Sequence, residues 1–152
     1  MATCLPLGLL VASVVTGIGL YITKSLTTRY GVILLMAAGF ALRLFYVLYT
    51  PVEIRQHDVW HFTDGTFAAF ENYRHAEYIE YIATYLKLPH VDPVGGLSQL
   101  YHPPFHHLIA GLWLRLQVEL GITYATACEN IQYLTLFYSS ACMVIVYRLL
   151  EL

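Results

Sequence analysis

Residues 30–49 read YGVILLMAAGFALRLFYVLY, a run of mostly apolar positions in which Arg43 is the only charge. A helix needs about 20 such residues to cross the hydrocarbon core of a bilayer. Three other stretches have a similar character: residues 5–23, residues 105–120, which Arg115 and Gln117 interrupt, and residues 131–150, which carry Arg148 near their end. The sequence therefore predicts an all-α, polytopic membrane fold of about four spans, with residues 1–152 forming a single membrane domain.

The composition agrees with this prediction. Of the 152 residues, 58% are hydrophobic and 12% are charged, whereas soluble domains carry about 25% charged residues. The net charge of −2 gives no basis for nucleic-acid binding. The three cysteines, Cys4, Cys128 and Cys142, lack metal-ligand spacing, so we interpret them as small apolar packing residues.

Basic residues predict the orientation of the spans. Lys24 and Arg29 flank a short turn with no acidic residue nearby, and the positive-inside rule places such a turn in the cytoplasm. The loop 51–104 then lies on the outer side of the cell membrane. It holds seven acidic residues and three basic ones, which agrees with an outer position.

Within this loop, residues 66–88 predict an amphipathic helix that Asp64 or Thr66 can cap and Pro89 ends. One predicted face is apolar and contains Tyr78, Ile79, Ile82, Tyr85 and Leu86. The opposite, polar face contains Arg74, Glu77, Glu80, Thr84 and Lys87. A tyrosine-rich amphipathic helix beside a span suits the headgroup region of a bilayer, so we predict that it is interfacial.

Asp58 is the predicted catalytic residue of the loop. It follows the second span closely and has aromatic neighbours in the segment His57-Asp58-Val59-Trp60-His61. Such a carboxylate can act as a general base on an acceptor hydroxyl, or it can bind a divalent metal ion. Its alternative role is to cap a loop turn. The His57 and His61 spacing invites zinc, but the segment lacks the glutamate of the metalloprotease pattern His-Glu-x-x-His.

Histidines gather in this part of the chain, since all seven lie between His57 and His107. We interpret His57, His61 and His75 as hydrogen-bonding groups for a phosphate or a sugar, with ordinary interfacial histidines as the alternative. Residues 101–107 read YHPPFHH, and proline suits the first turn of a helix. His102 and His106 then lie at the outer rim of the third span, where a helix N-terminus attracts phosphate. Histidines that only anchor the helix start are the alternative.

The order of these features resembles a known family. A span with an arginine comes first, then the loop residue Asp58, the run His-Ala-Glu-Tyr-Ile-Glu-Tyr-Ile at 75–82, a Leu-Pro-x-x-Asp turn at 88–92, and Tyr-His-Pro-Pro at 101–104 before an apolar helix. This order resembles the amino-terminal part of the GT-C membrane glycosyltransferases that use polyprenyl-phosphate sugars. The nearest branch is the bacterial protein-mannosyltransferase-like and aminoarabinose-transferase-like group. The resemblance covers about residues 35–150.

The resemblance implies that a sugar passes from a polyprenyl-phosphate carrier to a lipid, glycan or protein acceptor on the outer face. Asp58 matches by position the family's acidic residue near the donor phosphate. His75, Glu77, Tyr101, His102 and His106 are the expected substrate-binding residues, beside His57 and His61. The family often has an acidic pair where this chain has Asp58-Val59, which weakens the expectation of a metal ion there.

Family members have more spans and a second catalytic loop. The resemblance therefore implies that the chain is a fragment, one part of a split enzyme whose remainder is a second chain, or a reduced homologue. The alternative function is a non-catalytic membrane scaffold or assembly subunit, which would need no donor lipid. A histidine-rich metal transporter is disfavoured because, apart from His106 and His107 at the rim of the third span, the spans contain no histidine, and none contains an acidic pair to carry an ion.

Overall fold

The computed structural model describes residues 4–52, 62, 75–89 and 103–150. Over these residues the chain is helical and has no strand. It divides into two compact units, Met1–Thr50 with Thr135–Leu152 (unit 1) and Pro51–Leu134 (unit 2). The all-α prediction is confirmed for the described residues.

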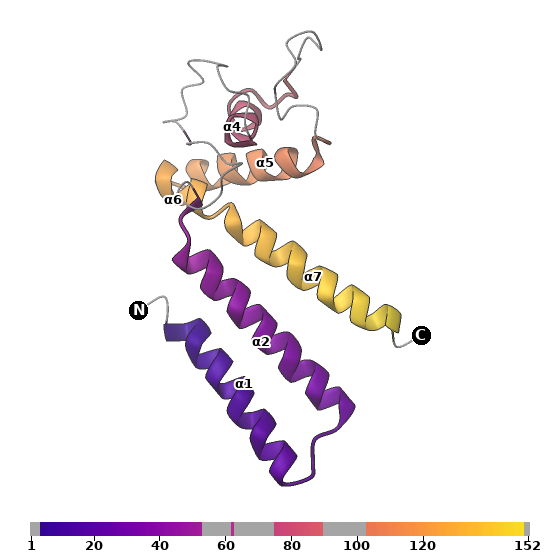
Figure 1. The fold of residues 1–152 in the computed structure, drawn as a ribbon. Helices are drawn as coiled ribbons and strands as arrows, with labels where there is room; N and C mark the ends of the chain where they lie inside the picture. The colour runs from indigo at the N-terminus through magenta and orange to yellow at the C-terminus, as the bar shows by residue number, and fades with distance from the viewer. Residues whose placement is uncertain (1–3, 53–61, 63–74, 90–102, 151–152) are drawn as a thin grey trace. The chain divides into compact units, whose positions relative to one another are not determined.

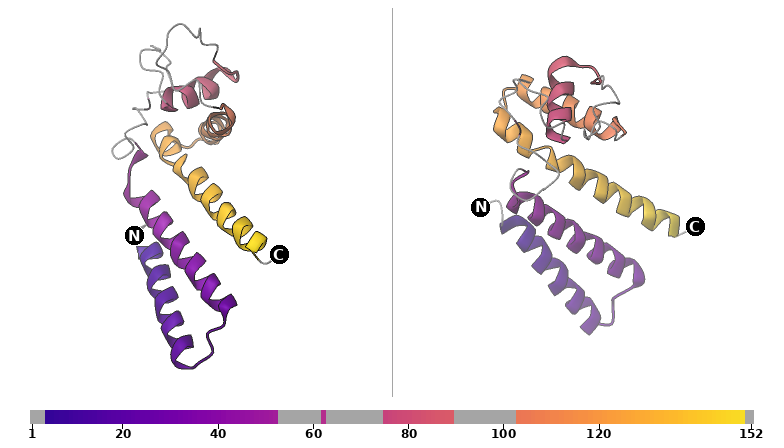
Figure 2. Two further views of the ribbon diagram at one scale, coloured as in Figure 1. Left: turned by 45° about the vertical axis from the view of Figure 1, so that its right-hand side comes forward. Right: turned by 45° about the horizontal axis from the view of Figure 1, so that its top comes forward.

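Unit 1 contains a hairpin of two apolar helices, α1 (Cys4–Ile22) and α2 (Thr28–Tyr49), which lie side by side in Figures 1 and 2. Lys24 adopts a left-handed φ of 55° in the turn between them. Thr27 then caps α2, because its hydroxyl accepts a hydrogen bond from the Tyr30 N–H at 3.3 Å. Among the described residues, α1 and α2 are the two helices that are long and apolar enough to cross a membrane.

The last helix, α7 (Gln132–Leu150), runs from unit 2 into unit 1. Within unit 1 it contacts α2 at Arg43, whose Nη1 lies 3.3 Å from the Met143 sulfur and donates to the Gly39 carbonyl at 3.1 Å. The predicted fourth span therefore forms a helix. Whether it crosses a membrane stays a prediction.

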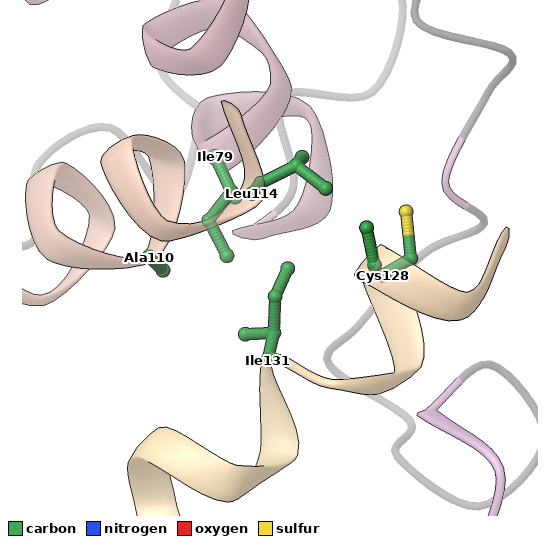
Figure 3. Close-up of a cluster of buried hydrophobic side chains, with 6 residues drawn as sticks. Ile79, Ala110, Leu114, Cys128 and Ile131 are labelled. Atoms are coloured by element: carbon green, nitrogen blue, oxygen red, sulfur yellow. The ribbon is translucent and has the colours of Figure 1, made fainter. Parts of the chain in front are cut away.

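Unit 2 is built from α4 (His75–Tyr85), α5 (Phe105–Glu119), α6 (Tyr124–Glu129) and the start of α7. Its core, shown in Figure 3, consists of Ile79, Ala110, Leu114, Ala127, Cys128 and Ile131. Gly111 sets the distance between α4 and α5, since a Cβ there would lie 2.7 Å from the Ile82 Cγ2. The two helices therefore cross with almost no space between them.

The apolar face of α4 is confirmed in part, since Tyr78, Ile79 and Ile82 are buried as predicted. Glu77 and Glu80, predicted on the polar face, are buried at 7% and 2% exposure, whereas Tyr85 and Leu86, predicted on the apolar face, are exposed. The helix also ends at Tyr85 and not at Pro89, because Leu86 takes a left-handed φ of 53°. The predicted start at residues 64–74 lies outside the described residues. The glutamates are buried because neighbouring helices cover α4 on more than one side: α5 packs on its middle, and Tyr124 of α6 donates a hydrogen bond to Glu80.

The predicted third span forms α5, but its buried stripe is partly polar. His107, Ala110, Gly111, Leu114 and Gln117 recur at helical spacing on the inward side. Gln117 donates to the Ala127 carbonyl at 3.2 Å and accepts from the Asn130 amide at 2.7 Å. Arg115 donates to the Ala83 carbonyl of α4 at 3.3 Å and pairs with Glu119 at 2.7 Å. These two polar residues thus connect helices of unit 2.

Candidate functional site

A pair of histidines joins α4 to α5. The Nδ1 of His75, the first residue of α4, lies 2.8 Å from the Nε2 of His107 in the first turn of α5. One of the two nitrogens carries a proton and donates it, and the other accepts. A single proton therefore lies between His75 Nδ1 and His107 Nε2. The first turn of α5 is closed by a hydrogen bond from the Leu108 N–H to the Pro104 carbonyl at 2.8 Å. This turn holds His107 at the position where it meets His75.

Tyr78 completes an aromatic stack on the same pair. Its ring lies 4.3 Å from the His107 ring, and His75 stacks on His107 at 5.1 Å, both with an interplanar angle of 13°. His107 is only 3% exposed. Burial also raises the pKa of Tyr78 above its usual value, so the phenol is neutral at physiological pH. The stack fixes His107 in one orientation.

His106 lies next to this buried pair but points outward. Its ring meets the His107 ring edge-on at 5.7 Å, and its side chain is exposed. Protein atoms around the ring desolvate it and lower the pKa of His106 below its ordinary value. At neutral pH this imidazole is therefore an uncharged hydrogen-bonding group at the N-terminus of α5, where backbone N–H groups attract an anion.

A second polar pair connects α4 to α6. The Tyr124 hydroxyl donates a short hydrogen bond to Glu80 Oε1, and Glu80 is 2% exposed. Burial, with the bond to Glu80 adding to it, raises the pKa of Tyr124 far above its ordinary value. The phenol is therefore a permanent donor to Glu80.

Tyr124 also lines a pocket of about 350 Å³ within unit 2. The other lining residues are Val52, Phe62, Ala125, Thr126, Cys128 and Glu129. Glu129 is held in place at the side of the pocket by two hydrogen bonds. Its Oε2 accepts from the Val52 N–H at 3.2 Å and from the Gln132 amide at 3.1 Å. Because the Tyr124 phenol donates to Glu80, the polar groups left to a ligand in this mostly apolar pocket are the Glu129 carboxylate and the Thr126 hydroxyl, beside the Phe62 ring. They can hydrogen-bond to a hydroxyl group.

The predicted site residues divide into two groups. His75 and His106 belong to the histidine cluster, and Glu77 is buried on α4. Asp58, His57, His61, Tyr101 and His102 lie outside the described residues. Val52 and Phe62, the described residues on either side of the segment with Asp58, both line the pocket. The expected metal ligand Asp58 is thus not described, and no three His, Cys, Asp or Glu side chains of the described residues gather as metal ligands.

Several residues of this region were not predicted as site residues. His107 has a signal in the sequence, because it precedes Ala110, Gly111 and Leu114 at the spacing of a buried helix face. Tyr78 was predicted as an apolar face residue only. Tyr124 and Glu129 have no local signal, since their partners Glu80 and Val52 lie far away along the chain.

Comparison with known proteins gives no family for this chain, since no protein-family model, no curated protein and no solved structure matches it.

Proposed function

We propose that this chain is a membrane glycosyltransferase, or the amino-terminal part of one, that transfers a sugar from a polyprenyl-phosphate carrier to an acceptor. The observation that carries the proposal is the contact between His75 and His107. His75 begins the run 75–82 of the family resemblance, and His107 lies three residues after its Tyr-His-Pro-Pro segment at 101–104. If each segment had only a structural role of its own, no contact between His75 and His107 would be required.

The roles follow from exposure and chemistry. His106 and the first N–H groups of α5 bind the donor phosphate, because the imidazole is exposed and the helix N-terminus favours an anion. The positioning residues are His75, His107 and Tyr78, since their rings stack on one another next to His106. The pocket at Tyr124 and Glu129 accommodates the sugar or the acceptor. Asp58, assigned by the resemblance, is the general base.

The position that we propose for α5 relative to the membrane depends on its exposed side. Four exposed residues of α5 are apolar and recur at helical spacing, namely Phe105, Leu108, Leu112 and Leu116, and the exposed Leu120 caps the helix. The helix has 15 residues, so at 1.5 Å per residue it is about 22 Å long, short of the roughly 30 Å hydrocarbon core. We therefore place α5 along the outer interface, with α1 and α2 crossing the bilayer. We propose that α7 crosses it as well, because its 19 residues span about 28 Å, although it is less apolar than α1 and α2. Arg148 then reaches the cytoplasm with Lys24 and Arg29, which satisfies the positive-inside rule.

The experiment that tests the function is transfer of a labelled sugar by membranes that contain the full chain, supplied with polyprenyl-phosphate sugars and with the remainder of the enzyme if it is a second chain. Asp58→Asn should lower transfer by about 100-fold or more, while binding of the donor is retained. Glu71→Gln, a carboxylate change in the same loop, is the control. Unchanged transfer in Asp58→Asn removes this residue from the chemistry, and a chain that binds no donor lipid is a scaffold.

A further inference from the structure

A groove of about 430 Å³ runs between α1 and α2 in unit 1. Its walls are almost entirely apolar and include Val14, Gly17 and Ile18 of α1 and Gly31, Leu34 and Ala38 of α2. The glycines leave the space open. A Cβ at Gly31 would meet nothing within 4 Å, and one at Gly17 would meet only the Leu34 Cδ1, at 3.5 Å.

Two cations lie at the end of this groove where the hairpin turns. Tyr21 and Leu26 line the groove there, and Lys24 lies between them, with its N–H bonded to the Tyr21 carbonyl at 3.1 Å. Arg29 follows in the first turn of α2, but its place two positions before Gly31 is on the opposite side of the helix from the groove residues. Both basic side chains are exposed, and residues 1–52 contain no acidic residue. The turn therefore carries a positive charge that nothing on the hairpin neutralises.

We propose that the groove between α1 and α2 binds an anionic phospholipid, with an acyl chain along the groove and the phosphate at the cationic turn, where Lys24 is the principal contact and Arg29 adds to the positive charge. An apolar groove alone would accept any hydrocarbon chain or a partner helix. The charge at its end selects a lipid with an anionic headgroup, since basic residues at a membrane surface attract such lipids. The site rests on the membrane placement of the hairpin, and it does not depend on sugar transfer.

The test uses native mass spectrometry of the purified full chain with equal amounts of phosphatidylglycerol and phosphatidylcholine. The wild-type chain should retain phosphatidylglycerol preferentially. The double variant Lys24→Gln/Arg29→Gln should lose at least fivefold of this preference, since each cation contributes about that factor. The control Arg55→Gln/Lys87→Gln removes the same charge from the loop 51–104, away from the hairpin turn, and should keep the preference.

The variant Gly17→Leu tests the role of the groove independently of the cations at its end. The leucine fills the groove and should release the bound phosphatidylglycerol, although both cations remain. Gly8→Leu is the matched control on the same helix, because its Cβ meets nothing within 4 Å and Gly8 does not line the groove. Lipid retention that is equal for the two headgroups, or unchanged in Gly17→Leu, overturns the proposal. So does a dimer that Gly17→Leu dissociates, since a second copy then occupies the groove.

Resistance to alkaline carbonate extraction, measured on the cell membranes from which the chain is purified, tests the membrane placement. A chain that resists extraction but shows no lipid preference overturns the lipid site alone. A chain that carbonate releases contradicts the membrane placement, and both proposals fail with it. Loss of sugar transfer with an intact lipid preference counts only against the proposed function.

Discussion

Gly111 is the residue on which the crossing of α4 and α5 depends. Any side chain there meets the Ile82 Cγ2 at 2.7 Å and the Ile79 carbonyl oxygen at 2.9 Å. The isoleucine side chain can shift slightly, but the carbonyl belongs to the α4 backbone and cannot move without the helix. The same crossing brings His75 to His107, so packing at Gly111 and the geometry of the histidine pair are connected.

Gly111→Ala should destabilise unit 2 by about 1–3 kcal/mol, because overpacking a close helix crossing forces the backbones apart. Hydrogen exchange of the α4 amides, measured on the chain in detergent, should show faster opening. Gly8→Ala is the control, since its Cβ meets nothing within 4 Å and alanine favours a helix. Equal exchange in wild type and Gly111→Ala would show that α4 and α5 do not cross this closely.

Tyr124→Phe should destabilise unit 2 by about 1–3 kcal/mol, since it removes the phenol donor from the buried Glu80 carboxylate. The exposed Tyr133→Phe is the control and should change little. Burial and the bond to Glu80 raise the pKa of Tyr124 above its ordinary 10.0, so the folded state favours the neutral phenol. This contribution is present below about pH 10 and is lost as the pH rises above it. Thermal midpoints from pH 8 to pH 11 should therefore fall more for wild type than for Tyr124→Phe.

At the scale of the helices, periodicity in the sequence locates the elements but not their partners. The predicted stretches 5–23, 30–49, 105–120 and 131–150 each form a helix within a few residues of these bounds. The polar face of α4 was predicted wrongly because Glu80 meets Tyr124, 44 residues away. Gln117, which interrupts an apolar stretch, bonds to residues of α6 and of the connection after it. The hydropathy pattern of a helix does not predict which residues far away along the chain its polar side chains will bond to.

The apolar side of α5 gives a prediction at this scale. A fluorescent label at Leu112→Cys or Leu116→Cys, in a chain reconstituted without its own cysteines, should be quenched more by nitroxides near the headgroups than by nitroxides at the bilayer centre. Both leucines are exposed in unit 2. A label at the exposed Thr84→Cys on α4 should be quenched by neither. Stronger quenching of Leu112 from the bilayer centre would instead indicate that α5 crosses the membrane.

For the whole molecule, the proposed three crossings place Ser25 and Leu149 on the same side. In the chain without its own cysteines, Ser25→Cys and Leu149→Cys should both be protected from an impermeant maleimide added outside the cell, whereas Thr84→Cys should react. If α5 crossed the bilayer as well, α7 would run in the opposite direction. Labelling of Leu149→Cys from outside would then show four crossings.

The candidate site was predicted only in part, and the reason is again distance along the chain. His75 and His106 were expected from their motifs, but the buried His107 that holds His75 became evident only when α4 and α5 packed together. The pocket at Tyr124 and Glu129 is assembled from segments that share no motif. Asp58, whose position the resemblance matches, lies outside the described residues.

The most direct test of the central claim is binding of polyprenyl monophosphate to the full chain, measured in a Lys24→Gln/Arg29→Gln background so that the groove in unit 1 does not contribute. The account predicts binding that His106→Ala and His107→Ala weaken about tenfold or more, while Phe105→Ala, a change at an exposed neighbour, leaves it intact. Binding that is absent from the parent chain, or equal in all these variants, would contradict a donor-phosphate site at the start of α5.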